Sequence, residues 1–284
     1  MSELRIGTCS WKYDSWRGIV YSLNPKINYL KEYSAKYSTV EIDQWFWSLT
    51  SEKNIVLPKQ DVAAAYNLSV PDNFRFTIKM PNSITLTHHY RKNKPEPLIQ
   101  NKYFLSVEVL NRTMENISVM KDKLGPLMLQ FEYLNKEKMP SQTIFLEKLE
   151  NFFHSADRQY SYGIEIRNPN YLNKDFFEFI EKNKLVFVFL EGYYMPDITT
   201  IYEKFGSHIK DKVVIRLHGP DRAGIEKKTK GEWNKIVEPK DEELGRIIEI
   251  IKDLLSKEVD IYLNVNNHYE GSAPLTINKI LSKL

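Results

Sequence analysis

Cysteine is almost absent from this chain of 284 residues, which contains Cys9 and no other. A single thiol excludes an internal disulfide framework and a cysteine-rich zinc site. No apolar run reaches the ~18 residues that a membrane-spanning helix needs. The initial segment MSELRIGTCSW also lacks the basic leader and apolar stretch of a secretory signal. The sequence therefore predicts a cytoplasmic protein that does not contact a membrane.

An excess of charge of one sign is also missing, because 40 Lys and Arg residues stand against 37 Asp and Glu residues, a net charge of +3. This balance excludes a broadly electropositive nucleic-acid-binding protein but is compatible with a local basic patch. Low-complexity tracts and short-period repeats are absent as well. What the chain does have is 42% hydrophobic residues, enough for a folded protein with a sizeable core.

Short segments rich in Val, Ile, Phe and Tyr alternate with helix-like segments along the whole chain. The predicted strands cover Leu4–Cys9, Thr39–Asp43, Phe74–Met80, Pro126–Phe131, Tyr162–Arg167, Leu185–Leu190, Val213–His218 and Ile261–Val265. The predicted helices cover Asn28–Tyr37, Tyr103–Lys123, Thr143–Phe153, Lys174–Lys182, Asp241–Lys257 and Ala273–Leu281, with less regular helical patterns at Lys59–Tyr66 and Asp197–Phe205.

Eight strands, each followed by a helix, over a chain near the ~250 residues typical of the fold, predict an α/β protein of the (β/α)8 TIM-barrel class. The competing architecture, an open doubly wound sheet, usually carries a G-x-G-x-x-G turn after its first strand. Here the first strand runs into Cys-Ser-Trp-Lys-Tyr instead. We expect one domain spanning residues 1–284, with Asp221–Pro239 as a long loop after the seventh strand.

Alternation along the predicted strands separates an apolar face from a face that becomes polar toward the carboxyl end. The polar face carries Glu41, Lys79, Gln130, Glu165, Arg167, Arg216, His218 and Asn266. TIM-barrel enzymes carry their chemistry at the carboxyl ends of the strands, so we expect these side chains to converge on a ligand site there. The structural alternative is a salt-bridge network in which the cations neutralise Glu41 and Glu165.

The strand ends form a combined pattern that covers essentially the whole chain in order. The segments are Ile-Gly-Thr-Cys-Ser-Trp (6–11), Thr-Val-Glu-Ile-Asp (39–43), Phe-Arg-Phe-Thr-Ile-Lys (74–79), Gly-Pro-Leu-Met-Leu-Gln-Phe (125–131), Ile-Glu-Ile-Arg-Asn (164–168), Val-Ile-Arg-Leu-His-Gly (214–219) and Val-Asn-Asn-His-Tyr-Glu-Gly-Ser-Ala-Pro (265–274). Together they resemble the family called domain of unknown function 72, or YecE-like.

The resemblance implies a TIM barrel and no established reaction, because the family is uncharacterised. Carried over position by position, it implies a site made of Glu41, Lys79, Gln130, Glu165, Arg167, Arg216, His218, Asn266 and Asn267. The sixth strand departs from the pattern, since many members end it in aspartate and this chain has Glu191.

The residue types at these positions suit acid–base chemistry on a small anionic or phosphorylated sugar-like substrate. We expect Glu165 and His218 to move protons, with Glu41 as a second carboxylate. Arg167 and Arg216 suit binding of a carboxylate or phosphate, and Lys79 adds positive charge or, if desolvated, Schiff-base chemistry. Hydrolase, lyase and isomerase reactions all remain open, and Gln130, Asn266 and Asn267 are assigned to substrate binding.

Aromatic residues gather after the first two predicted strands, at Trp11, Tyr13, Trp16, Trp45, Phe46 and Trp47. Core packing explains some of them, but loop aromatics beside a cationic pocket also stack on sugars or bases, so Trp11 and Tyr13 are assigned to substrate binding. We predict no cofactor and no metal, because the inward set is rich in cations and His88-His89 lacks a zinc-site spacing.

Two other functions fit the same residues. One is a nucleic-acid-binding or nucleic-acid-processing barrel, in which the basic segments Arg91–Lys94 and Lys227–Lys230 contact phosphates. The other is a non-catalytic sensor of a small anionic ligand. The fold does not choose among them, because TIM barrels host many unrelated functions.

Overall fold

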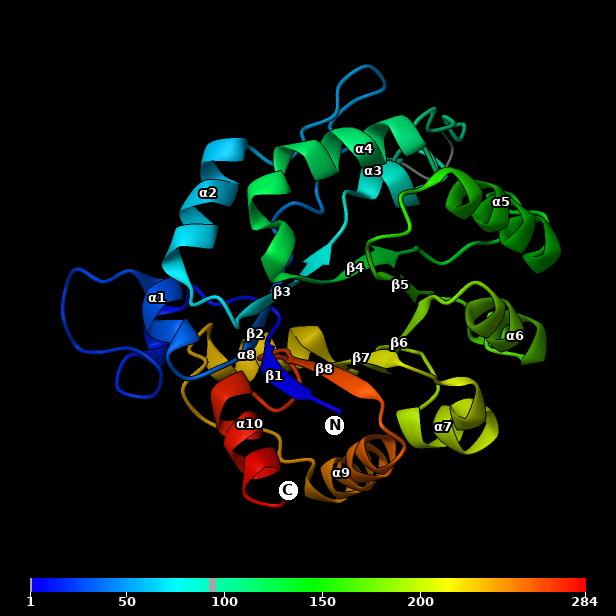
Figure 1. The fold of residues 1–284 in the computed structure, drawn as a ribbon. Helices are drawn as coiled ribbons and strands as arrows, with labels where there is room; N and C mark the ends of the chain where they lie inside the picture. Colours follow the sequence, from blue (N-terminus) through cyan, green and yellow to red (C-terminus); the bar gives the residue numbers. More distant parts are fainter. Residues whose placement is uncertain (1, 92–95) are drawn as a thin grey trace.

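Eight parallel strands close into a barrel in chain order, with β8 paired to β1 (Figure 1). The computed structural model describes residues 2–91 and 96–284. The strands are β1 (Leu4–Thr8), β2 (Thr39–Ile42), β3 (Arg75–Lys79), β4 (Leu124–Gln130), β5 (Tyr162–Glu165), β6 (Val186–Gly192), β7 (Lys212–Gly219) and β8 (Asp260–Val265). The predicted TIM barrel is confirmed, and each predicted strand lies within a few residues of an observed one.

Helices surround the strands on all sides (Figure 1). The α-helices are α1 (Tyr29–Ser34), α2 (Gln60–Ser69), α3 (Asn82–Thr85), α4 (Val107–Asn116), α5 (Gln142–Ser155), α6 (Lys174–Lys182), α7 (Ile198–Phe205), α8 (Arg222–Thr229), α9 (Asp241–Ser256) and α10 (Ala273–Leu281). Short 3₁₀ helices are η1 (Asp14–Trp16), η2 (Ser118–Lys123), η3 (Pro169–Tyr171) and η4 (Gly206–His208). Among the described residues, no helix combines the length and the apolar character needed to cross a membrane.

Several segments differ from the sequence prediction, among them the short helix α3, which no predicted helix included. The predicted loop Asp221–Pro239 contains α8, whose first turn is capped by Asp221 through the N–H of Gly224. This helix buries only Ile225 and Thr229, so its sequence lacks the apolar periodicity that reveals a helix. The predicted helix Tyr103–Lys123 begins later, after the Ser106 cap, and its last turn and a half is the separate 3₁₀ helix η2.

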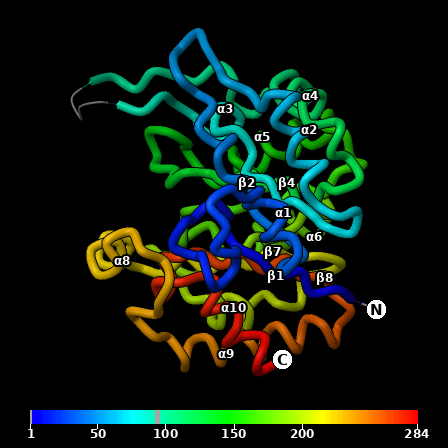
Figure 2. Tube along the Cα trace, turned by 90° about the vertical axis from the view of Figure 1, so that its left-hand side faces the viewer, coloured from blue at the N-terminus to red at the C-terminus, as the bar shows by residue number. Residues whose placement is uncertain are grey.

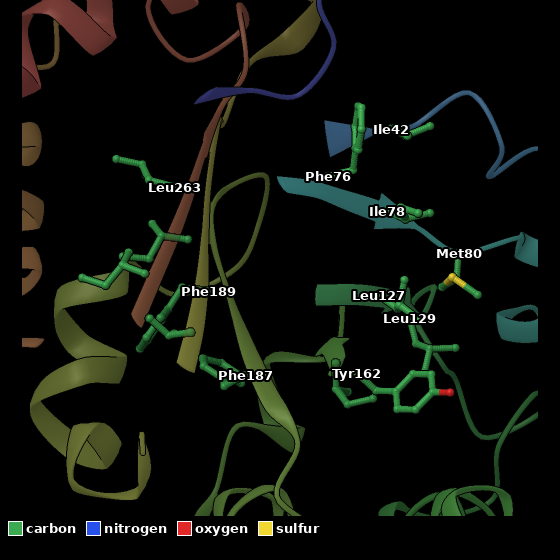
Figure 3. Packing of buried hydrophobic residues seen from close by; sticks show 14 of the residues in the cluster. Ile42, Phe76, Ile78, Met80, Leu127, Leu129, Tyr162, Phe187, Phe189 and Leu263 are labelled. Atoms are coloured by element: carbon green, nitrogen blue, oxygen red, sulfur yellow. The ribbon is translucent and has the colours of Figure 1, made fainter. Parts of the chain in front are cut away.

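The barrel has an apolar shell outside and a smaller apolar layer inside. Outward side chains pack against the helices, and Figure 3 shows Ile42, Phe76, Ile78, Met80, Leu127, Leu129, Tyr162, Phe187, Phe189 and Leu263 in this shell. Residues at the opposite parity form a second cluster inside the barrel, made of Met128, Val186, Val188, Val214 and Tyr262. The inner layer closes the amino-terminal half of the barrel, so the polar residues lie above it toward the carboxyl ends.

The strands are parallel, so their carboxyl ends and the loops that follow them lie on one side of the molecule. In Figure 2 the N-terminus lies at the right of the barrel, whereas α8, which follows β7, lies at the left. We call the left side, with the carboxyl ends of the strands, the barrel mouth.

Two glycines bring the ends of β6 and β7 into close contact at the mouth. Gly192 has φ = 133° and Gly219 has φ = 76°, values that favour glycine. A Cβ atom on Gly192 would lie 2.4 Å from the carbonyl oxygen of Gly219. The backbone approach directs the next residue, Tyr193, whose N–H donates to the Gly219 carbonyl at 3.2 Å.

We expect Gly192→Ala to lower the free energy of unfolding by about 1–3 kcal/mol, because it adds a steric clash to the strained φ. Urea unfolding measures this loss. The matched control is Gly231→Ala, where φ is also positive (80°) but a Cβ would meet nothing within 4 Å. If the two variants lose equal free energy of unfolding, the close approach of β6 and β7 does not add to the cost of Gly192→Ala.

Candidate active site at the barrel mouth

Arg216 on β7 is the centre of an ion-pair network inside the barrel. Its Nε donates to Oε2 of Glu41 at 2.8 Å and its Nη2 donates to Oε1 of Glu41 at 2.6 Å, a bidentate contact. Its Nη1 donates to Glu165 on β5. All three side chains are at least 98% buried. The planar edge of the guanidinium is therefore already occupied by a carboxylate of the protein itself.

Gln130 and Arg167 extend the network toward solvent. Arg167 Nε donates to Oε1 of Glu165 at 2.7 Å, and Arg167 Nη2 donates to Oε1 of Gln130 at 3.2 Å. The same Gln130 oxygen accepts from Arg216 at 3.4 Å. The side chain of Arg167 is 14% exposed against 2% for Arg216, so Arg167 is the guanidinium that a ligand can reach.

The network fixes the charges of its buried members. Burial alone would raise the pKa of Glu165, but Arg216 and Arg167 outweigh it and lower that pKa to about 2. Glu165 and Glu41 in turn raise the pKa of Arg216 above its ordinary value, against the effect of burial. Glu165 is thus a permanent carboxylate near neutral pH, and this geometry does not favour the proton-transfer role expected of it.

Lys79 lies at the carboxyl end of β3, with its Nζ 3.8 Å from the centroid of the Phe46 ring. The ammonium group is partly buried, and no ion pair with a carboxylate is formed by it among the described residues. Burial, and then the charge of Arg216, lower the pKa of Lys79 to about 8. A fraction of this lysine is therefore neutral in mildly alkaline solution.

Asp43 is a site residue that the sequence interpretation missed, although it lies two positions after Glu41 and shares its parity. It follows β2 directly and is half-buried. Burial, and then the charge of Glu41, raise the pKa of Asp43 to about 6. The mouth therefore holds three carboxyl groups and three cations, namely Glu41, Asp43 and Glu165 with Lys79, Arg167 and Arg216. The net charge of the mouth changes when Asp43 titrates.

His218 lies between a thiol and a phenol. Its Nε2 is 3.6 Å from Sγ of Cys9, and its Nδ1 is 3.4 Å from the hydroxyl of Tyr193. Burial, and then the charges of Arg216, Arg167 and Lys79, hold the pKa of His218 well below its usual value. The imidazole is neutral at physiological pH, so it can exchange hydrogen bonds but is not a cationic acid.

Tyr193 was also missed, and no sequence signal reveals it. Its φ of 56° is unusual for a residue other than glycine and follows from the contact between Gly192 and Gly219. In this conformation the ring lies 4.5 Å from the guanidinium carbon of Arg167 and 5.8 Å from the ring of His218. Tyr193 thus covers the network on one side.

The two predicted asparagines take different places. Asn266 is partly exposed, and its Oδ1 accepts from the N–H of His268 at 3.0 Å, which shapes the loop after β8. Asn267 is buried, and its Oδ1 accepts from the N–H of Ala273 at 2.9 Å, at the start of α10. Neither joins the Arg216 network, so the structure favours loop-shaping contacts for both.

The aromatic cluster after β1 and β2 divides into core and mouth. Trp11 is buried and packs edge-on against Tyr66 of α2, with ring centroids 5.1 Å apart. Trp16 is fully buried. Tyr13 is partly exposed and lines a small hollow together with Cys9 and Asn266. Burial, and then the charge of Asp43, raise the pKa of Tyr13 to about 12. Tyr13 therefore remains a mouth residue, whereas Trp11 belongs to the core.

Glu191, the residue that departs from the family pattern, does not face the barrel interior. It shares the parity of Phe187 and Phe189, which pack outward. Its Oε2 accepts from the N–H of Ile198 at 2.9 Å, at the first turn of α7. Burial, and then the charge of Glu243, raise the pKa of Glu191 to about 7. Its role is to hold the start of a helix.

Each of the two basic segments has one ion pair among the described residues. Lys227–Lys230 begins on α8 and continues past its end, and Lys228 donates to Glu238 at 2.6 Å. Arg91 pairs with Glu137 at 2.9 Å. Residues 92–94 of the other basic segment lie outside the described residues. Within the described parts of the chain, no group of three or more His, Cys, Asp or Glu side chains is placed to hold a metal ion.

The protein is a TIM barrel with a network of paired charges at the mouth. The family model described as "Protein of unknown function DUF72" matches residues 5–284, so the chain belongs to the DUF72 family. The sequence-based recognition of this family is confirmed.

Solved structures of DUF72 family proteins have a similar fold. One from Thermotoga maritima MSB8 is 21% identical, with a TM-score of 0.67 over 99% of this chain and 98% of that chain. One from Enterococcus faecalis V583 is 18% identical, with a TM-score of 0.68 over 98% and 95%. No curated protein matches the chain. These comparisons establish the family and the fold, and they assign no reaction.

We expect Arg216→Met to lower the free energy of unfolding by about 3–5 kcal/mol at pH 7, because it leaves Glu41 buried without an ion-pair partner and Glu165 with Arg167 alone. The pH dependence should also invert. In the wild type the pKa of Glu165 is lowered, so its contribution is present above pH ~4.5 and is lost as pH falls toward 2. In the variant, stability should rise as pH falls from 7 to 5, since protonation removes the uncompensated charge.

Urea unfolding at pH 7 and pH 5 measures both effects. The control is Lys228→Met, which breaks an exposed ion pair with Glu238 and should cost at most about 1 kcal/mol. An Arg216→Met variant as stable as the control would mean that the network does not hold the barrel together.

Proposed function

We propose that this DUF72 protein is an enzyme that acts by acid–base chemistry on a small anionic substrate, such as a phosphorylated or acidic sugar. One observation carries the proposal: Lys79 and Asp43 both contact Phe46 at the partly exposed edge of the ion-pair network. The Nζ of Lys79 lies 3.8 Å from the Phe46 ring centroid, and the carbonyl of Asp43 accepts from the Phe46 N–H at 3.1 Å. The pKa values of Lys79 and Asp43 are about 8 and about 6. A general acid or base works best with a pKa near the working pH.

Arg167 and Lys79 are the groups that bind the anion. Both are partly exposed, whereas Arg216 is buried and engaged by Glu41. Arg167 keeps donor capacity beyond its contacts with Glu165 and Gln130, because a guanidinium has five N–H groups. Arg216 supports the site indirectly by holding Glu165 in place to orient Arg167.

Asp43 is the proton-transfer residue of this proposal, and His218 supplies a neutral hydrogen bond. Glu165 and Glu41 stay ion-paired to Arg216 and do not take part in proton transfer. His218 would polarise a substrate group rather than act as an acid, because burial and then the surrounding cations keep its imidazole neutral. Tyr193 and Cys9 fix the orientation of its ring.

Binding of the anion should depend on pH through these two groups. Affinity falls as pH rises through ~6, because Asp43 gains a negative charge, and falls again as pH rises through ~8, because Lys79 loses its positive charge. Calorimetric titrations of glucuronate, galacturonate, glucose 6-phosphate and ribose 5-phosphate at pH 5.5, 7 and 9 measure this. Lys79→Met should weaken binding at pH 7 by about tenfold and remove the step near pH 8.

Asp43→Asn separates an enzyme from a sensor. This variant should bind the anion as well as the wild type at pH 5.5, while conversion of the bound compound, followed by NMR, should fall at least about a hundredfold, the usual contribution of one acid–base group. Binding without conversion by the wild type would identify a sensor. Absence of binding across the panel at every pH would refute the proposal.

A further inference from the structure

Four large aromatic side chains are exposed on the loops around the mouth. Trp47 is 67% exposed, Tyr194 59%, Tyr90 56% and Tyr133 51%. They follow β2, β6, β3 and β4, respectively, so all four lie at the carboxyl-end side of the barrel. Contiguous exposed apolar groups on a soluble domain mark binding surfaces.

The four rings form two pairs, and each pair joins two different loops. The ring centroids of Trp47 and Tyr90 lie 6.1 Å apart, and those of Tyr133 and Tyr194 lie 6.3 Å apart. Both spacings fall within the range of preferred aromatic contacts. Packing between loops holds the rings in place before a ligand arrives, which lowers the entropy cost of stacking on them.

Each pair is connected to one of the two accessible cations. Trp47 packs edge-on against Phe46 at 5.1 Å, and Phe46 lies under the ammonium group of Lys79. In the second pair, Tyr194 directly follows Tyr193, whose ring centroid lies 4.5 Å from the guanidinium carbon of Arg167. Each aromatic pair is therefore next to a residue that contacts one of the two cations of the proposed anion position.

Polar groups on the loop after β4 lie beside Tyr133 and contact the loop that carries Tyr90. Glu132 directly precedes Tyr133, forms an ion pair with Lys138, and accepts from the Thr87 hydroxyl at 3.4 Å. Carboxylate, ammonium and phenol groups beside exposed rings can bind the hydroxyls of a ligand whose other face is apolar. Sugar rings have this combination of hydroxyl edges and apolar C–H faces.

We propose that the mouth takes an oligosaccharide with a single acidic sugar, in which the acid group binds Lys79 and Arg167 and neutral neighbouring sugars stack on the pairs Trp47–Tyr90 and Tyr133–Tyr194. This inference rests on the proposed function and names its substrate class. A polyanion such as single-stranded nucleic acid fits less well. Arg91 and Lys138 already pair with Glu137 and Glu132, and these carboxylates would repel successive phosphates.

The test compares glucuronic acid with oligosaccharides in which one glucuronic acid is joined to one or three neutral xylose units. Calorimetry at pH 5.5 should show affinity rising with length, by roughly tenfold from the acid alone to the tetrasaccharide. Trp47→Ala and Tyr133→Ala should each remove most of the rise in affinity with length. Both variants should bind glucuronic acid alone with the affinity of the wild type. Lys79→Met should weaken binding of every member.

Leu68→Ala is the matched control, because Leu68 is 85% exposed and lies near the end of α2, on the opposite side of the barrel. It should change no affinity. If glucuronic acid binds but length adds nothing, or if Trp47→Ala weakens the acid and the tetrasaccharide equally, the oligosaccharide inference is refuted and the proposed function stands.

If no oligosaccharide of the series binds and no compound of the anion panel binds either, both the oligosaccharide inference and the proposed function are refuted. A third outcome would indicate a nucleic acid in place of an oligosaccharide as the ligand. Salt-sensitive binding of a single-stranded oligonucleotide that is lost in Trp47→Ala, with no oligosaccharide binding, would identify the rings as stacking sites for bases.

Discussion

The bidentate contact between Arg216 and Glu41, completed by Glu165, is the interaction on which the rest of this structure depends. A guanidinium at 2% exposure carries a large desolvation cost, which only well-placed opposite charges offset. The partners come from β2 and β5, and Gln130 adds a contact from β4. A single side chain of β7 therefore links three other strands of the barrel.

The same interaction decides which groups are available for chemistry. It occupies Arg216, Glu41 and Glu165 with one another, so their charges are permanent and their hydrogen-bonding capacity is largely used. Burial and then the charge of Arg216 keep His218 neutral and lower the pKa of Lys79, while burial and then the charge of Glu41 raise the pKa of Asp43. The groups that the proposed function uses are thus the ones at the edge of the network. The structural interpretation describes Arg216, Glu41 and Glu165, whereas a functional role of Lys79, Asp43 and Arg167 stays a proposal.

The sequence predicted the fold and most of the inward-facing residues because both follow from short-range periodicity. Side chains alternate with a period of two in any strand, so Glu41, Lys79, Gln130, Glu165, Arg167, Arg216 and His218 could be placed on one face before the barrel was seen. Asp43 obeys the same rule, and it was passed over although the pattern placed it there. Helix α8 was missed because it buries too few side chains to show a helical period.

The sequence by itself determined the eight-stranded barrel, the family and the face on which the polar residues lie, because these depend on patterns within segments. Only the tertiary structure decided which cation is buried and which is accessible, since ion pairing depends on distances between separate strands. It also decided that Tyr193 covers Arg167, because the left-handed conformation of Tyr193 comes from the contact between Gly192 and Gly219. The pairing of Trp47 with Tyr90 and of Tyr133 with Tyr194 has the same origin: loops remote in sequence meet only when the barrel closes.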